Sequence, residues 1–330
     1  MTSKIILTGI TPSGTPHIGN YIGAIKPALD AQSDEGKHYY FISDLHSLVK
    51  LWDAKQRQSN VLEVAATWMA LGLDTSKTVF YRQSDIPEIC ELNWILTTLA
   101  AKGLLNRAHA YKDQVAKNEA DGQDPDNAIT MGLYCYPVLM SADILAFHAT
   151  HVPVGKDQIQ HLEIARDLAL RFNHVYQDTL TPPAAVANDK TQTILGTDGR
   201  KMSKSYNNTI PIFSTSKKLR KNIMKIVTNS QPPEEPKDPD NCTVFSIYQS
   251  VASADEVAAL RTHYQSGIGW GDAKQILFEK LDALLTEPRE RYDALMQDPK
   301  PVTEALAAGA EQARAVARQT LVEVKTAVGL

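Results

Sequence analysis

Basic and hydroxyl side chains are concentrated in one short segment, residues 199–205, with the sequence GRKMSKS. Lysine acts as a compact positive charge on phosphate oxygens, and serine hydroxyls can add hydrogen bonds. The alternative is a basic surface loop that contacts only water. Because the pentapeptide KMSKS is a specific motif rather than a generic basic run, we predict a mobile loop that handles phosphate.

A glycine-containing loop near the start of the chain is a second candidate for phosphate binding. An apolar run, residues 5–7, leads to Gly9, and the loop TPSGTP precedes a helix that begins near Ile18. Glycine lets the backbone approach a nucleotide closely, and His17 and Asn20 can donate hydrogen bonds to a triphosphate. Taken alone, the loop is also compatible with an ordinary turn between a strand and a helix.

A third group of residues has the spacing of a helical binding face. Tyr136, Met140 and Asp143 are four and then three residues apart, so one face of a helix presents all three. An aromatic ring, a thioether and a carboxylate suit an indole, whose N–H needs an acceptor when it is buried. The alternative from spacing alone is a core helix in which Asp143 caps a neighbouring element.

Short apolar segments alternate with helical periodicity in the first 205 residues. Strands are expected around residues 5–7, 39–42, 78–81 and 152–154. The alternation predicts an α/β fold with a doubly wound parallel sheet of the Rossmann type, in which ligands bind beyond the C-terminal ends of the strands. Two helix-rich stretches between the third and fourth strands predict a helical insertion at about residues 90–145.

The pattern changes after Ser205. A basic helix is expected over residues 216–226, and most of the remainder shows helical periodicity, with a last helix at about residues 302–330. We therefore predict two domains. Residues 1–205 form the Rossmann-type catalytic domain, and residues 206–330 form an α-helical domain.

Composition limits the class of protein. The chain has 330 residues, 43% hydrophobic and 22% charged, with a net charge of −4, so any nucleic-acid-binding surface must be local. Neither a signal peptide nor a membrane span is evident, and we expect a cytoplasmic protein without a membrane partner. The three cysteines form no CxxC pair, and His46, His151 and His161 lack metal-site spacing, so we expect no zinc and no protein-held metal.

The motifs HIGN (residues 17–20) and KMSKS (residues 201–205) together resemble those of class I aminoacyl-tRNA synthetases. Residues 136–145 and 152–158, the helix of residues 161–172, and residues 309–330 are similar to bacterial tryptophanyl-tRNA synthetases. The resemblance covers nearly the whole chain. It implies ATP-dependent activation of L-tryptophan and transfer to tRNA(Trp), by a homodimer in which each tRNA spans both subunits.

The resemblance also implies the amino-acid site. Asp143 would bind the indole nitrogen, with Met140 and Tyr136 packed around the ring. The remaining site residues would be Leu7, Gly9, His46 and Gln158. A tyrosine–tRNA ligase is the runner-up, since a phenol also donates to an aspartate. Tyrosyl enzymes usually carry a tyrosine at the position of Leu7. Because a leucine side chain offers no hydrogen bond to a phenol hydroxyl, Leu7 favours tryptophan as the substrate.

For ATP, the resemblance implies catalytic roles for Lys201, Lys204 and Lys112. Without the resemblance, a solvated surface lysine is an equally good interpretation of Lys112. The implied nucleotide contacts are Thr11, Pro12, Ser13, His17, Gly19, Asn20, Gly155, Lys156, Asp157, Ile194, Met202, Ser203 and Ser205. Lys156 stands where the family usually has a glutamate, which puts a side-chain role there in doubt. Mg²⁺ should arrive with ATP.

Some relatives hold an iron–sulfur cluster on four cysteines of the C-terminal domain. Only Cys242 matches that set here, with His263, Trp270 and Ala273 at the other aligned positions, so no cluster is expected. The resemblance assigns the helical domain to the tRNA anticodon. The basic helix is our candidate for phosphate contacts, and a solvated amphipathic face is the alternative. A non-catalytic paralogue that senses tryptophan or binds RNA is a third hypothesis, disfavoured by the intact KMSKS lysines.

Overall fold

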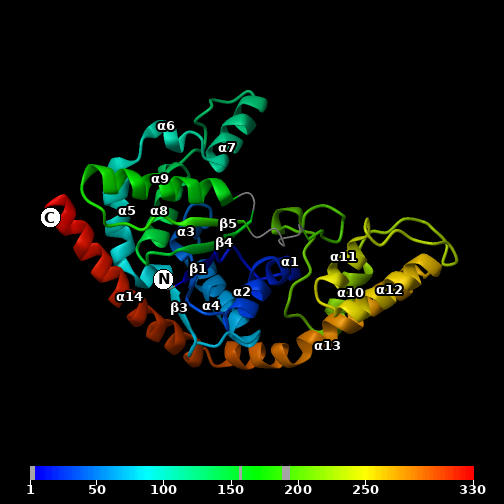
Figure 1. The fold of residues 1–330 in the computed structure, drawn as a ribbon. Coiled ribbons are helices and arrows are strands. Elements are labelled where there is room, and N and C mark those ends of the chain that lie inside the picture. The colour runs from blue at the N-terminus through cyan, green and yellow to red at the C-terminus, as the bar shows by residue number, and fades with distance from the viewer. Residues whose placement is uncertain (1–3, 156–157, 188–193) are drawn as a thin grey trace.

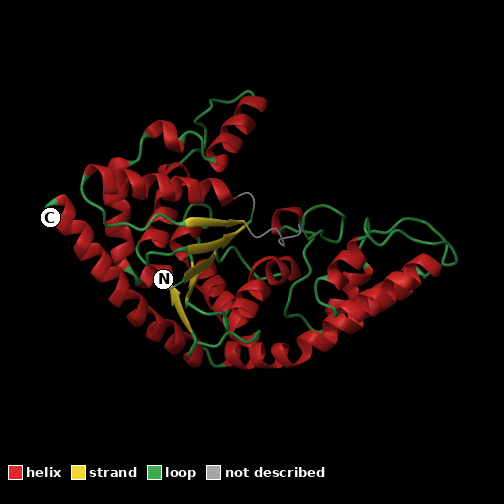
Figure 2. Cartoon of the chain, in the orientation of Figure 1, coloured by secondary structure: helices red, strands yellow, loops and turns green. Residues whose placement is uncertain are grey.

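A five-stranded parallel sheet forms the centre of the N-terminal part of the molecule (Figures 1 and 2). The computed structural model describes residues 4–155, 158–187 and 194–330. The strand order is β3-β2-β1-β4-β5, with the bounds Ile5–Ile10, Lys37–Ile42, Thr78–Arg82, His151–Val154 and Ala184–Ala187 for β1 to β5. The four strands expected from the sequence and the doubly wound Rossmann-type fold are confirmed. The fifth strand was missed, because its sequence AAVA has one β-branched residue among three alanines, which are depleted in strands.

The two faces of the sheet pack into separate hydrophobic clusters. On β2, Tyr40 and Ile42 join one cluster, whereas Tyr39 and Phe41 join the other. This is the alternation expected of a strand that is covered on both faces. Helices therefore flank the sheet on both sides (Figure 1). The chain order reverses between β1 and β4, and the crevice at their C-terminal ends is where such sheets bind ligands.

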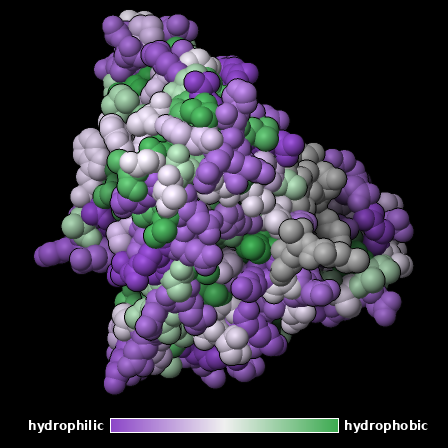
Figure 3. Space-filling model, turned by 60° about the vertical axis from the view of Figure 1, so that its left-hand side comes forward, coloured by the Kyte–Doolittle hydropathy of each residue, from purple (hydrophilic) through white to green (hydrophobic). Residues whose placement is uncertain are grey.

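The expected helical insertion lies between β3 and β4. It contains α5 (Pro87–Leu99), α6 (Lys102–Leu105), α7 (His109–Ala120) and α8 (Met131–Leu145). The N-terminal part also contains α3 (Asp44–Ser47), α4 (Ala54–Ala70) and α9 (Ile159–Val175). Among the described residues, no helix is long and apolar enough to span a membrane. On the face drawn in Figure 3, hydrophobic residues form small separate patches among hydrophilic ones.

The helix after the first loop is less regular than expected. It consists of α1 (Ile18–Asn20), a π-helical segment η1 (Tyr21–Ile25) and α2 (Lys26–Ala31). Pro27 lies at the start of α2 and has no N–H to donate to the preceding turn. The wider π-helical turn directly before it accommodates this missing hydrogen bond.

The C-terminal part is helical, as expected. Its helices are α10 (Ser216–Met224), α11 (Thr243–Gln249), α12 (Ala254–Ser266), α13 (Trp270–Gln297) and α14 (Lys300–Val328). Figure 1 shows α13 and α14 as one long arc that leads from the α10–α12 group back along the sheet. Gly309 of α14 lies against the backbone of Phe80 in β3, and Arg314 binds Glu88 of α5 at 3.0 Å. The last helix thus packs on β3 and α5 of the N-terminal part, and a domain boundary at residue 206 stays a prediction.

Candidate active site

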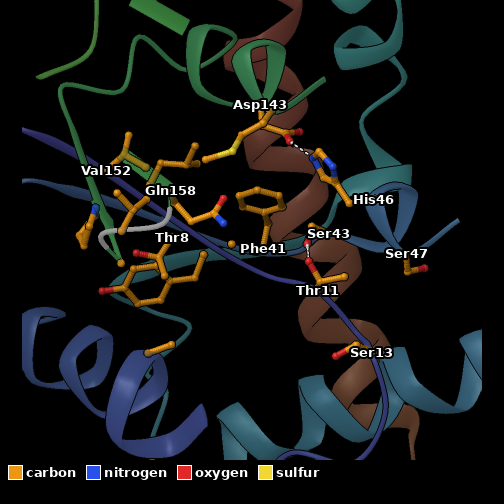
Figure 4. Close-up of a pocket in the computed structure, with 18 of the residues that line it drawn as sticks. Thr8, Thr11, Ser13, Phe41, Ser43, His46, Ser47, Asp143, Val152 and Gln158 are labelled. Atoms are coloured by element: carbon orange, nitrogen blue, oxygen red, sulfur yellow. Dashed lines mark hydrogen bonds and ion pairs between the residues drawn. The ribbon is translucent and has the colours of Figure 1, made fainter. Parts of the chain in front are cut away.

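A cavity of about 1010 Å³ opens at the C-terminal ends of β1, β2 and β4. All seven residues expected in the amino-acid site line this cavity: Leu7, Gly9, His46, Tyr136, Met140, Asp143 and Gln158. Thr11, Ser13 and Gly155 of the expected nucleotide site line the same cavity. The structure therefore brings together residues that are spread over 150 positions of the sequence, and Figure 4 shows how they converge.

Asp143 provides a buried carboxylate at one end of this cavity. Its side chain is 1% exposed, and burial raises the pKa of the carboxyl, whereas hydrogen bonds from His46 and Gln83 act in the opposite sense. His46 Nε2 lies 2.8 Å from Asp143 Oδ2 (Figure 4). An ionised carboxylate can only accept, so in that state of Asp143 the hydrogen bond is donated by Nε2–H of His46. Asp143 thus accepts hydrogen bonds from two side chains at the cavity wall and does not cap a neighbouring element, and its contact with an indole nitrogen stays a prediction.

A second hydrogen-bonded chain orients Tyr136. Its hydroxyl lies 2.7 Å from His161 Nε2, and His161 Nδ1 lies 2.8 Å from Gln158 Oε1. His161 is 1% exposed and was expected only as a structural or substrate-adjacent group. The contacts show that it joins two expected site residues from α8 and the start of α9.

Phe41 is a cavity residue that the sequence reasoning missed. It lines the cavity from β2, and its ring stacks on Tyr81 with a centroid distance of 5.6 Å. A Cβ placed on Gly9 would lie 2.5 Å from Phe41 Cζ. Glycine is therefore needed at position 9 because the neighbouring ring fills the space of a side chain. The period-2 pattern of β2 already placed Tyr39 and Phe41 on one face and could have signalled this contact.

The HIGN and KMSKS motifs are in direct contact. His17 caps α1, with its Nδ1 accepting from the Asn20 amide at 3.3 Å and Asn20 Oδ1 accepting from the His17 amide at 3.1 Å. The Gly19 amide donates to Met202 Sδ at 3.3 Å. Burial, together with the charge of Lys204, lowers the pKa of His17 to about 4. The ring is therefore neutral near pH 7, and Nε2–H remains as its donor.

Lys204 extends the same contact to the first loop. A Cβ placed on Gly14 would lie 3.4 Å from Lys204 Nζ, and Gly14 also has a φ of 121°, which favours glycine. Burial lowers the pKa of Lys204 to about 8, and the carboxylate of Glu63 acts in the opposite sense. One lysine of the motif thus lies over the glycine loop, while Lys201 is exposed.

The shape of the KMSKS loop depends on Asn208, which sequence reasoning also missed. Its side chain accepts from the Ser203 amide at 2.8 Å and donates to the Lys201 carbonyl at 3.0 Å and to Asp198 Oδ1 at 2.6 Å. Asn208 is 1% exposed, so these bonds replace water that the loop backbone would otherwise bind. Asn208 therefore holds the first half of the motif, from the Lys201 carbonyl to the Ser203 amide.

Some expected site residues are not placed in the cavity. Lys112 is an exposed residue of α7 and is not among the lining residues. Ile194 is buried, with its carbonyl accepting from the Met202 amide, and the Pro12 carbonyl accepts from Asn60. Lys156 and Asp157 lie outside the described residues. Within the described part of the chain, no three His, Cys, Asp or Glu side chains are grouped so that they could hold a metal ion.

Comparison with known sequences points in one direction. A family model described as tRNA synthetases class I (W and Y) matches residues 2–286. The tryptophan–tRNA ligase of Pseudomonas aeruginosa is 53% identical, in a match that covers 100% of this chain and 74% of that protein. The tryptophan–tRNA ligase of Neisseria meningitidis is 50% identical, with coverage of 100% and 99%.

Solved structures give the same result. The tryptophanyl-tRNA synthetase of Campylobacter jejuni, complexed with ADP and tryptophan, superposes with a TM-score of 0.88 at 44% identity, covering 99% of this chain and 100% of that one. The tyrosyl-tRNA synthetase of Aeropyrum pernix superposes with a TM-score of 0.69 at 18% identity, covering 93% and 90%. At that identity the similarity concerns the fold alone.

Proposed function

Since the chain belongs to the class I tRNA synthetases for tryptophan and tyrosine, and among them to the tryptophan–tRNA ligases, we propose that it activates L-tryptophan with ATP and transfers it to tRNA(Trp). The observation that carries the proposal is the buried acceptor Asp143, in a cavity that also reaches the loop beside the HIGN and KMSKS motifs.

Tryptophan is the substrate that this cavity suits. Asp143 accepts the indole N–H, and Met140 and Tyr136 pack around the ring system. Leu7, Gly9, His46 and Gln158 complete the amino-acid site. Leu7 is 1% exposed and offers no partner to a phenol hydroxyl, which a tyrosine would have to bury.

The first step is a displacement at the α-phosphate of ATP. The tryptophan carboxylate attacks phosphorus, the bond to the bridging oxygen breaks, and pyrophosphate leaves with the adenylate as the second product. Positioning and charge stabilisation supply the catalysis, without a covalent enzyme intermediate. Lys201 and Lys204 accompany the pyrophosphate, and the neutral His17 ring donates from Nε2 to the triphosphate.

The remaining nucleotide contacts follow from the family. Thr11, Pro12, Ser13 and Gly155 would lie along the nucleotide, and Gly19, Asn20 and residues 201–205 along the phosphates. Lys112, Lys156, Asp157 and Ile194 complete the proposed set, with Lys112 reaching the phosphates from α7. Mg²⁺ comes bound to ATP and neutralises phosphate charge.

In the second step, the terminal ribose hydroxyl of tRNA takes the tryptophanyl group and AMP leaves. Helix α10 exposes Lys217, Lys218, Arg220 and Lys221, while Leu219 and Ile223 are buried. These exposed cations support phosphate contacts by the helical domain near the anticodon. A homodimer and a cytoplasmic location complete the proposal. The 68% exposure of Trp94 on α5 supports an interface at that helix.

Amino-acid-dependent exchange of pyrophosphate into ATP tests the function. We expect exchange with tryptophan and little with tyrosine. Exchange with tyrosine alone would identify a tyrosine–tRNA ligase, and no exchange with either would support a non-catalytic paralogue. We further expect Lys201→Ala to lower the adenylation rate far more than tryptophan affinity. Equal losses in both would contradict the role of Lys201 at the leaving group.

A further inference from the structure

We propose that Gln83 is a positioning residue for substrate selection, which orients the Asp143 carboxylate so that Oδ1 keeps an acceptor site for a single N–H donor. The inference rests on the proposed function and deepens it. It assigns the preference for an indole N–H to a pair of side chains, because the acceptor is selective only when its orientation is held by a neighbour.

Gln83 lies at the C-terminal end of β3, in the short helix η2 (Gln83–Asp85), and is 0% exposed. Its Nε2 lies 2.7 Å from Asp143 Oδ1 and 2.9 Å from Oδ2. Its Oε1 accepts from the Leu45 amide at 3.1 Å. A backbone N–H can only donate, so Oε1 must face Leu45 and the NH₂ group must face Asp143. The amide is therefore fixed as a donor to the carboxylate.

The two oxygens of Asp143 are not equivalent. Oδ2 receives hydrogen bonds from both His46 and Gln83, whereas Oδ1 receives one from Gln83 alone among the described residues. Each carboxylate oxygen has two lone pairs. Oδ1 thus keeps the capacity for one further donor, and the carboxylate borders the cavity in which the amino acid would lie.

The same residue also holds the segment that carries His46. Gln83 binds the Leu45 amide of α3, and its neighbour Ser84 donates to Asp44 from both its amide, at 2.9 Å, and its hydroxyl, at 2.6 Å. Asp143, His46 and Gln83 therefore form one network that joins η2, α3 and α8, in which Asp143 and Gln83 are buried and the His46 side chain is 14% exposed. Such a network has few alternative arrangements, because a lost partner would leave a buried polar group unsatisfied.

The burial of Asp143 makes the donors important for its charge as well. Burial raises the pKa of this carboxyl, and the hydrogen bonds from His46 and Gln83 favour the ionised form. Removal of the Gln83 donor would favour the protonated acid, whose hydroxyl could turn toward the substrate as a donor. The site would then lose its preference for an N–H over an isosteric group without a proton.

The experiment compares two substrates in pyrophosphate exchange. One is tryptophan, and the other is the analogue in which sulfur replaces the indole N–H. For the unchanged enzyme we expect kcat/KM to favour tryptophan by about tenfold to a hundredfold, the range for a hydrogen bond to a charged group. In Gln83→Met and Gln83→Leu, which replace the carboxamide by an apolar group and so remove the donor, this ratio should fall to within about threefold.

The ratio is independent of how much of a variant folds, since both substrates meet the same enzyme sample. The control is Gln319→Met on α14, whose Nε2 binds Glu323 at 3.2 Å away from the cavity and whose ratio should stay unchanged. The KM for ATP should also stay unchanged in the Gln83 variants. If both substrates lose activity equally and the ratio persists, Gln83 is only structural and the inference is wrong. If the unchanged enzyme shows no exchange with tryptophan, it is the proposed function that fails.

Discussion

A single methyl group at position 9 should displace the Phe41 ring, which borders the proposed tryptophan site. In Gly9→Ala, the new Cβ would lie 2.5, 2.7 and 3.2 Å from three ring atoms of Phe41. Carbon atoms in contact prefer separations of about 3.5–4.0 Å, so the ring must move by roughly 1 Å. Phe41 is 6% exposed and stacks on Tyr81, which leaves the cavity as the side toward which it can move.

The magnitude follows from the packing. Overpacking of a core position costs about 1–3 kcal/mol. If the ring moves into the cavity, most of this cost appears when tryptophan binds, because the ligand must push the ring back. Since about 1.4 kcal/mol corresponds to a factor of ten, the Kd for tryptophan should rise by about fivefold to 150-fold. The melting temperature should change little, because the free protein relieves the strain in the cavity.

Isothermal titration with tryptophan, with thermal unfolding in parallel, is the assay. Gly271→Ala on α13 is the matched control, since a Cβ there meets nothing within 4 Å and the change should be neutral or slightly stabilising. In Gly9→Ala combined with Phe41→Leu, the smaller side chain should restore part of the affinity. An unchanged Kd together with an unchanged melting temperature would refute the close contact between Gly9 and Phe41.

Three further predictions concern the two motifs. The pKa of Lys204 is about 8 in the free protein, so kcat/KM for ATP should fall above pH 8 as the charge is lost, and Lys204→Arg should flatten that decline. The pKa of His17 is lowered from 6.5 to about 4, so between these values the unfolded chain binds the extra proton. Acidification from pH 6.5 to 4 should therefore cost up to about 3 kcal/mol of unfolding free energy, and urea titrations of His17→Asn should show a smaller loss. Asn208→Ala should lower the exchange kcat at least tenfold at unchanged tryptophan Kd, because the partly buried Ser203 amide loses its acceptor. A parallel loss of affinity would speak against a role confined to the loop.

Much of this protein could be predicted from local patterns in the sequence. The alternation of strands and helices indicated the doubly wound sheet, because each pattern reflects the burial of one element on its own. The spacing of Tyr136, Met140 and Asp143 placed three side chains on one helical face, since a helix has a fixed period. The motifs at residues 17–20 and 201–205 indicated phosphate chemistry before any contact between them was known.

The tertiary structure decided which of these groups meet. No local pattern relates Gln83 to Asp143, which lies 60 positions later, because their hydrogen bonds depend on how β3, α3 and α8 pack together. The strand at Ala184–Ala187 could likewise not be predicted from the sequence, because its pairing with β4, and not the intrinsic propensity of its residues, makes it a strand. The contact of Gly19 with Met202 spans 183 positions, and it forms because both loops lie at the same edge of the sheet. The sequence by itself determined the elements and the chemical groups they carry, whereas packing over long distances determined their orientation, their burial and hence their acid–base properties.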